Sequence, residues 1–202
     1  LDTIGVRTPA IHWELTGLRV NVQERLYGRP ASSLGSPSGD PRVAAFAKSY
    51  ANAVLRMIIL NGEFHGDPHP GNVFLIGEQD VGFIDFGSVG TLTKARRDEI
   101  VRLVLAIAGE ETSEVADVLL AWAGEPKVDR NALAVDLDQL IGEFRGTVLS
   151  GIEFSQIFSR VFDLLRDYQL VLPPDLAILL RPLLTAEGVV RSLAPDYNIA
   201  ED

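Results

Sequence analysis

The sequence predicts an α+β fold that is mostly helical, with a short strand pair near the N-terminus and one small hairpin. Helices are indicated by long segments after residue 40 in which apolar residues recur at helical spacing between Gly and Pro breaks. The hairpin is indicated by two short apolar runs separated by turn residues. With 202 residues and a hydrophobic fraction of 47%, the chain can bury a core of ordinary size.

The N-terminal region contains two short apolar or alternating runs, at residues 9–13 and 19–23, on either side of Thr16-Gly17. This arrangement predicts two strands joined by a turn. Residues 31–40 are rich in Ser, Gly and Pro and predict an exposed loop.

The first long helix is predicted to begin at Pro41, with Asp40 as its N-cap, and to end at Asn61-Gly62. A second helix is predicted to follow a Thr93 cap and to run to about residue 108. Its expected buried stripe consists of Ile100, Leu103, Val104 and Ile107. Further helices are predicted at residues 113–123, 130–149, 154–169 and 174–193.

Composition excludes several classes of function. A net charge of -10 and a pI near 4.8 argue against nucleic acid as a partner and against simple adhesion to anionic lipid. The absence of cysteine excludes disulfides and thiolate metal sites. No membrane span is expected, because Arg102, Asp175 and Arg181 interrupt the most apolar candidates. The chain begins Leu1-Asp2-Thr3, without Met or a signal pattern, which we interpret as a cut end.

Residues able to do chemistry concentrate between Asn61 and Gly90. The apolar runs 73–76 and 81–84 form the predicted hairpin, so its ends bring Asn72 and Asp85 together, with Asp67 on the loop leading in. Prolines at 68 and 70 restrict that loop. Two carboxylates and an amide on a stiff loop suit a hard divalent cation, with one carboxylate left to act as a base.

These residues resemble a known family. Asp67 and Asn72 have the D-x-x-x-x-N spacing that precedes D-F-G in protein kinases. The wording F-H-G-D-P-H-P-G-N at 64–72 and I-D-F-G-S-V-G at 84–90 resembles the UbiB/ADCK family of atypical kinases, as do residues 6–13, 18–28 and 172–177. The resemblance implies a protein-kinase-like C-lobe over residues 31–202, with residues 1–30 as the end of the N-lobe and the hinge.

The resemblance also implies roles for individual residues. Asp67 would be the catalytic base, and Asn72 and Asp85 would hold Mg²⁺. The backbone of Glu24 and Leu26 would hydrogen-bond the adenine of ATP or ADP. The residues expected to support the site structurally are His65, His69, Phe86 and Gly87.

The function implied by the resemblance is that of an atypical kinase or ATPase supporting isoprenoid quinone (ubiquinone-type) biosynthesis. Its expected partners are a nucleotide, an isoprenoid lipid or membrane surface, and quinone-pathway proteins. The expected location is cytoplasmic or matrix-like, at the periphery of a membrane.

The cationic elements that phosphoryl transfer needs are not found in this sequence. Its lysines are Lys48, Lys94 and Lys127, none of which lies in a strand-like V-A-x-K context, and no Gly-rich or Ala-rich nucleotide loop occurs. We therefore expect weak nucleotide binding and no detectable turnover by these residues alone.

Three alternatives remain open at the level of sequence. His65, Asp67 and His69 could bind zinc or iron instead. Aminoglycoside and choline phosphotransferases share the short H-G-D-x-x-x-x-N motif. A non-catalytic interaction module is the third, which an exposed apolar patch on residues 174–193 would favour.

Overall fold

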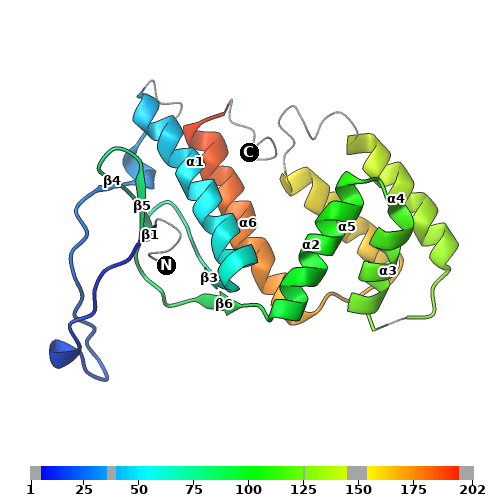
Figure 1. The fold of residues 1–202 in the computed structure, drawn as a ribbon, viewed down its shortest axis with the longest axis horizontal. Coiled ribbons are helices and arrows are strands. Elements are labelled where there is room, and N and C mark those ends of the chain that lie inside the picture. The colour runs from blue at the N-terminus through cyan, green and yellow to red at the C-terminus, as the bar shows by residue number, and fades with distance from the viewer. Residues whose placement is uncertain (1–5, 36–39, 125, 145–153, 196–202) are drawn as a thin grey trace. The chain divides into compact units, whose positions relative to one another are not determined.

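The computed structural model describes residues 6–35, 40–124, 126–144 and 154–195 (Figure 1). Packing divides the described residues into two compact units, residues 6–89 with 181–195 (unit 1) and residues 90–180 (unit 2). The mostly helical α+β class is confirmed. The predicted lobe boundary at residues 30 and 31 concerns ancestry rather than packing, and it stays a prediction.

A four-stranded mixed sheet lies in unit 1, in the order β1 (Val6–Arg7), β5 (Asp80–Phe83), β4 (Val73–Ile76) and β2 (Arg29–Pro30). The predicted hairpin is confirmed as β4 and β5, which pair antiparallel with Val73 opposite Phe83 and Ile76 opposite Asp80. β2 extends the sheet antiparallel to β4, and β1 extends it parallel to β5. Short 3-10 helix η3 (Ala31–Ser33) follows β2.

The N-terminal arm, which we define as residues 9–27, does not form the predicted strand pair. Two isolated antiparallel bridges, Ile11 with Gln23 and Gly17 with Val20, replace a ladder. A 3-10 helix, η2 (Trp13–Leu15), interrupts the first run. The prediction was wrong because, among the described residues, none covers the tip of the arm: Leu18 is fully exposed, so its side chain gains no packing to stabilise a pleated pair.

Helix α1 (Pro41–Arg56) packs against β5 (Figure 1). The predicted N-cap is confirmed, because the Asp40 side chain accepts a 3.0 Å hydrogen bond from the Arg42 N–H. The helix continues as a π-helical segment, η4 (Met57–Asn61), and ends at Gly62, whose φ is 74°.

The stretch from Pro41 to Asn61 is also long and apolar enough to cross a membrane by length and composition. This helix is not among the candidates that the expectation of no span considered. Half of the stretch is buried inside the protein, and a core helix of a soluble domain meets the same criterion.

After Gly62, β3 (Glu63–His65) pairs with β6 (Val89–Thr91), the strand in which the boundary between the units falls. Helix α6 (Pro174–Leu193) gives its first residues to unit 2 and the others to unit 1.

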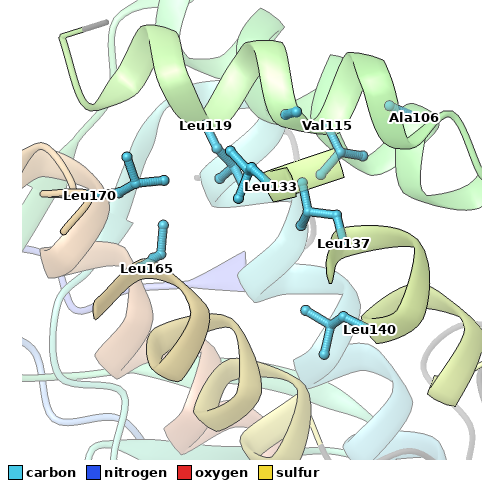
Figure 2. Packing of buried hydrophobic residues seen from close by; sticks show 9 residues of the cluster. Ala106, Val115, Leu119, Leu133, Leu137, Leu140, Leu165 and Leu170 are labelled. Atoms are coloured by element: carbon cyan, nitrogen blue, oxygen red, sulfur yellow. The ribbon is translucent and has the colours of Figure 1, made fainter. Parts of the chain in front are cut away.

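Unit 2 is built from helices α2 (Lys94–Ala108), α3 (Thr112–Trp122), α4 (Arg130–Phe144) and α5 (Phe154–Asp167), in which successive helices pack together. The predicted helices are confirmed, although the C-terminal end expected for the fourth lies outside the described residues. Figure 2 shows the core of this unit, formed mainly by leucines from α3, α4 and α5. Its central members are Leu119, Leu133, Leu137 and Leu165.

The predicted Thr93 cap of α2 is confirmed by a 3.2 Å hydrogen bond from the Arg96 N–H, but the predicted buried stripe is wrong at two of its four residues. Val104 is 57% exposed and Ile107 is 42% exposed. Leu103, which the predicted stripe includes, packs on the core of unit 2 beside the buried Ala106, which it does not include. Helical spacing alone therefore located the inward position Leu103 but did not separate it from its outward neighbours Val104 and Ile107.

A polar network joins three helices of unit 2. Arg96 on α2 forms ion pairs with Glu99, at 2.6 Å, and with Asp175 at the start of α6, at 2.8 Å. The Trp122 indole N–H donates to the same Glu99 carboxylate at 2.7 Å. Arg96 therefore ties the first turn of α2 to the first turn of α6.

Candidate functional site

The β4–β5 hairpin positions Asn72 and Asp85. Val73 pairs with Phe83, and the Ile84 N–H donates to the Asn72 carbonyl at 3.0 Å. Asn72 therefore lies opposite Ile84, the residue immediately before Asp85. The Asn72 side chain is buried, whereas Asp85 is exposed.

His65, on β3, connects the loop that carries Asp67 to the segment that carries Asp85. Its Nδ1 accepts a 3.1 Å hydrogen bond from the Asp67 N–H, and its Nε2 lies 3.0 Å from the Ile84 carbonyl oxygen. A carbonyl can only accept, so Nε2 must carry the proton. The two partners thus fix one neutral tautomer of a buried imidazole, whose ring joins the two halves of the site.

Aromatic contacts and one turn hold the D-F-G segment. The His65 ring lies between Phe83 and Phe86, with centroid separations of 5.6 and 5.0 Å. Asp85 has φ 59°, in the left-handed region that Asp tolerates better than most residues, and its Oδ1 accepts from the Gly87 N–H at 3.3 Å. Such backbone outliers concentrate at functional sites.

The loop between His65 and Asn72 is fixed to its surroundings. The buried Tyr50 hydroxyl on α1 donates to the Pro68 carbonyl at 2.9 Å, and the Ser32 N–H donates to the Pro70 carbonyl at 3.0 Å. Burial raises the pKa of Tyr50, so its hydroxyl keeps the proton that this bond uses. The sequence signal that could have identified this bond is that a buried phenol needs a hydrogen-bond acceptor.

His69 shapes the same loop internally. It is exposed, its N–H donates to the Asp67 carbonyl at 2.9 Å, and its carbonyl accepts from the Asn72 N–H at 2.8 Å. Its Nδ1 accepts from the Gly71 N–H at 3.1 Å. These bonds form a compact turn between the candidate base and the candidate metal ligand.

Asp67 is half-buried, and within the described part of the chain its carboxylate takes part in no hydrogen bond or ion pair. Its backbone is engaged instead: the carbonyl accepts from the Asn72 amide at 3.4 Å. An aspartate whose backbone is hydrogen-bonded and whose carboxylate has no partner is suited to accept a proton or orient water.

Gly66 precedes Asp67 because Ser88 leaves it no room for a side chain. The Gly66 N–H donates to the Ser88 carbonyl at 2.8 Å, and a Cβ on Gly66 would lie 3.1 Å from that same carbonyl oxygen and meet the Ser88 hydroxyl. This contact joins the Asp67 loop to the segment after D-F-G a second time, and the sequence analysis did not foresee it.

The predicted hinge lines an open cavity of about 370 Å³ in unit 1. Its wall consists of residues 23–28 together with Phe74 of β4 and Ile84, the residue before Asp85. The Glu24 N–H is already used by the Ala10 carbonyl at 2.7 Å. Among the described residues, no partner occurs for the Glu24 carbonyl or the Leu26 N–H, so these two groups face no competing bond.

The Glu24 side chain has a structural role. Its carboxylate accepts from the Ala10 N–H at 3.2 Å and from Arg7 at 2.8 Å. The backbone bond from Ala10, and next the Arg7 guanidinium, hold the pKa of Glu24 below its usual value. The carboxylate therefore links the two ends of the N-terminal arm.

The residues present fit a magnesium ion better than zinc or iron. The described residues contain no group of three His, Cys, Asp or Glu side chains placed to hold a metal, and both ring nitrogens of His65 are already engaged. The Asn72 amide nitrogen donates to the Asp67 carbonyl, so the Asn72 side-chain oxygen could serve as a ligand together with the Asp85 carboxylate. Mg²⁺ is commonly held by one or two such oxygens, with phosphate and water completing the shell.

Two family models match this chain. Residues 2–119 match the ABC1 atypical kinase-like domain, and residues 137–198 match the UbiB helical domain. The first match covers the hinge, the Asp67 loop and the D-F-G segment.

Curated relatives are similar along nearly the whole chain. An uncharacterized protein in the hydrogenase 1 5' region of Clostridium pasteurianum is 28% identical over 99% of this chain and 38% of its own length. The chloroplastic protein ACTIVITY OF BC1 COMPLEX KINASE 1 of Arabidopsis thaliana is 27% identical over 99% of this chain and 30% of its own. A probable protein kinase UbiB of Cellvibrio japonicus is 27% identical over 95% and 36%. The chain spans about a third of the length of these relatives.

Among solved structures, the Mycobacterium tuberculosis protein Rv3197, in its complex with erythromycin, has a similar fold. The TM-score is 0.61 at 18% identity, over 91% of this chain and 48% of that one. Together with the family models, this similarity confirms the kinase-like fold and the resemblance identified from Phe64–Asn72 and Ile84–Gly90, and the chain belongs to the ABC1 atypical kinase-like family.

Proposed function

We propose that this chain provides the magnesium and adenine half-site of a UbiB-like atypical kinase or ATPase. One observation carries the proposal: His65 bonds the Asp67 N–H with one ring nitrogen and the Ile84 carbonyl with the other. This bridge holds the candidate base and the candidate metal ligands in one rigid constellation, as pre-organised phosphoryl transfer requires.

In this proposal, Asn72 and Asp85 hold Mg²⁺ and Asp67 receives the proton of the attacking hydroxyl or water. Bound Mg²⁺ neutralises phosphate charge. The Asp67 carboxylate is open to this role because its backbone, rather than its side chain, makes the bonds that position it. The exposed Asp85 has a left-handed backbone conformation, and the next residue, Phe86, packs on the His65 ring.

The proposed adenine site is the cavity beside the hinge. The Leu26 N–H would donate to the base and the Glu24 carbonyl would accept from it, while Phe74 and Ile84 provide apolar walls. Because Ile84 is also adjacent to Asp85, a nucleotide lying in this cavity would direct its phosphates toward the metal ligands.

Calorimetry with ATP and Mg²⁺ tests the half-site. We expect magnesium-dependent binding with a Kd in the millimolar range, about 4 kcal/mol, since no strand lysine covers the phosphates. Asp85→Asn should weaken binding about tenfold or more, whereas the control Asp80→Asn, an exposed carboxylate at the opposite end of the hairpin, should leave it unchanged. No binding by the folded protein, or equal binding by both variants, would contradict the proposal.

Turnover separates the half-site from a complete enzyme. We expect no detectable ATP hydrolysis by these residues alone, for want of the phosphate-binding cations. Robust hydrolysis that Asp85→Asn abolishes would show instead that the chain supplies those cations from residues we have not assigned.

We also propose that the function belongs to isoprenoid quinone biosynthesis at a membrane periphery, in a cytoplasmic or matrix-like compartment. Support for the quinone role comes from the relatives named UbiB and from the family model of the helical domain. The test is quinone content in a bacterium whose UbiB protein carries this chain in place of the matching segment, with Asp85→Asn in that chimera as the control that should fail.

Family membership favours this proposal over an aminoglycoside-type phosphotransferase. The interaction-module alternative gains no support from α6, where the large exposed apolar side chains are Ile178 and Leu184. Six positions apart on a helix, they lie on different faces and form no patch.

A further inference from the structure

The outward face of α2 exposes a group of large apolar side chains. Val101, Val104, Leu105 and Ile107 are between 37% and 65% exposed within seven consecutive residues. Val101, Val104 and Leu105 follow helical spacing and form a continuous stripe. The opposite side of the same helix, through Leu103 and Ala106, already packs on the core of unit 2. Clustered apolar exposure of this kind marks interaction sites, unlike single exposed side chains.

A groove of about 340 Å³ runs beside this stripe, within unit 2. Its apolar lining is Val101, Leu105 and Ala106 of α2. Its polar lining consists of three carboxylates and one guanidinium: Asp98, Glu111, Glu114 and Arg102. The groove therefore combines apolar side chains of α2 with charged side chains whose sum is negative.

The charges at the rim are unequally satisfied. Arg102 is paired with Glu114, and this hydrogen bond, before all other causes, lowers the pKa of that carboxyl. Asp98 pairs with Lys94 at 2.6 Å, but both groups are highly exposed, so the pair is weak. Among the described residues, the Glu111 carboxylate has no hydrogen-bonding or ionic partner. Glu111 lies just beyond the C-terminus of α2, as the N-cap residue of α3.

We propose that the α2 groove binds a basic amphipathic helix of a partner protein. The apolar face of such a helix would cover Val101 and Leu105, and its Lys or Arg side chains would reach Glu111 and Asp98. Anionic lipid would meet like charge at this rim, and a second copy of the chain would bring another acidic groove. The inference uses only residues of α2 and the segment that begins α3, so it does not depend on the proposed nucleotide site.

Fluorescence anisotropy with a labelled synthetic helix of leucine and lysine tests the proposal, with a second peptide carrying glutamate at every lysine position. We expect the lysine peptide to bind and the glutamate peptide not to bind. Leu105→Ser should weaken binding about tenfold, as at an apolar anchor. Glu111→Gln should weaken it by about threefold and reduce its dependence on salt.

The matched control is Val135→Ser, because Val135 on α4 is 66% exposed and does not line the groove. It should bind like the unmodified protein, and circular dichroism should show that all variants remain folded. Equal loss in Leu105→Ser and Val135→Ser, or no loss in either, would mean non-specific adhesion and overturn the proposal. So would two other results: self-association that Leu105→Ser removes, which assigns the face to a second copy, or binding to neutral lipid vesicles that Leu105→Ser removes, which assigns it to a membrane.

Discussion

The β4–β5 hairpin and the N-terminal arm have similar sequence patterns and different structures. Both consist of two short apolar or alternating runs around a turn. The hairpin forms a four-residue ladder in which Val73 and Phe83 are completely buried. The arm forms isolated bridges and leaves Trp13, Leu18 and Val20 in solvent.

The difference shows that the covering helix, rather than the strand pattern, decides whether a pair forms. Phe83 packs against Tyr50 of α1, with ring centroids 5.9 Å apart, so each side chain of the hairpin's inner face gains burial. Two-stranded pairs without such a partner are marginal in water. The consequence is a rigid hairpin holding the proposed metal ligands and a loosely held arm leading into the hinge.

The largest expected effect is from Phe83→Ala. Phe83 is fully buried between Tyr50 and His65, and its removal should lower the free energy of unfolding by about 3–5 kcal/mol. The equivalent change in the arm, Leu18→Ala, should stay within about 0.5 kcal/mol. Urea unfolding of both variants measures the contrast, and a comparable loss in Leu18→Ala would mean that the arm is packed after all.

Tyr50→Phe should have the next largest effect. The change keeps the ring but leaves the buried Pro68 carbonyl without its donor, at a cost of about 1–3 kcal/mol. Tyr168→Phe is the control, because the Tyr168 hydroxyl bonds Asp136 at an exposed position. Thermal or urea unfolding should separate the two, and faster amide exchange of His69 in Tyr50→Phe would show that the Asp67 loop has loosened.

Gly28→Ala tests the junction between arm and sheet. A Cβ at Gly28 would lie 2.6 Å from the Leu75 carbonyl oxygen, so the β2–β4 pairing must shift, costing about 1–3 kcal/mol. Gly17→Ala, in the turn of the arm, meets no atom within 4 Å and should be neutral or stabilising by up to about 1 kcal/mol. If the two variants unfolded at the same urea concentration, the hinge could not be in contact with β4 as described.

The smallest effect is the acid response of the arm. The pKa of Glu24 is depressed in the folded state. Its carboxylate therefore contributes to folding stability above the ordinary pKa of 4.5, and this contribution is lost as the pH falls through the folded-state pKa. The amide resonance of Ala10, which donates to this carboxylate, should titrate with a midpoint below 4.5. Glu24→Gln should abolish the titration, and a midpoint above 4.5 would contradict the pairing with Arg7.

Local signals were sufficient for much of the fold. The N-cap residues Asp40 and Thr93 mark where α1 and α2 begin, and Gly62 marks where the first helical segment ends. The turn residues after Ile76 placed the hairpin to within one residue. These features depend on neighbours in the chain, so a single sequence contains the information.

Contacts between distant segments could not be read in this way. The parallel pairing of β1 with β5, the bond from Tyr50 to Pro68 and the approach of Ser88 to Gly66 all join residues far apart in the chain. Likewise, α2 has two apolar faces, and nothing local says that Leu103 rather than Val104 packs inward.

The sequence by itself determined the order of the helices, the hairpin and the family, because caps, turns and the D-x-x-x-x-N and D-F-G spacings are local patterns. Tertiary structure alone decided which apolar runs become strands, which face of α2 is left open, and which tautomer of His65 joins the two halves of the site. The physical reason is that burial and the choice of hydrogen-bond partner depend on which surfaces meet, and that is a property of the whole folded chain.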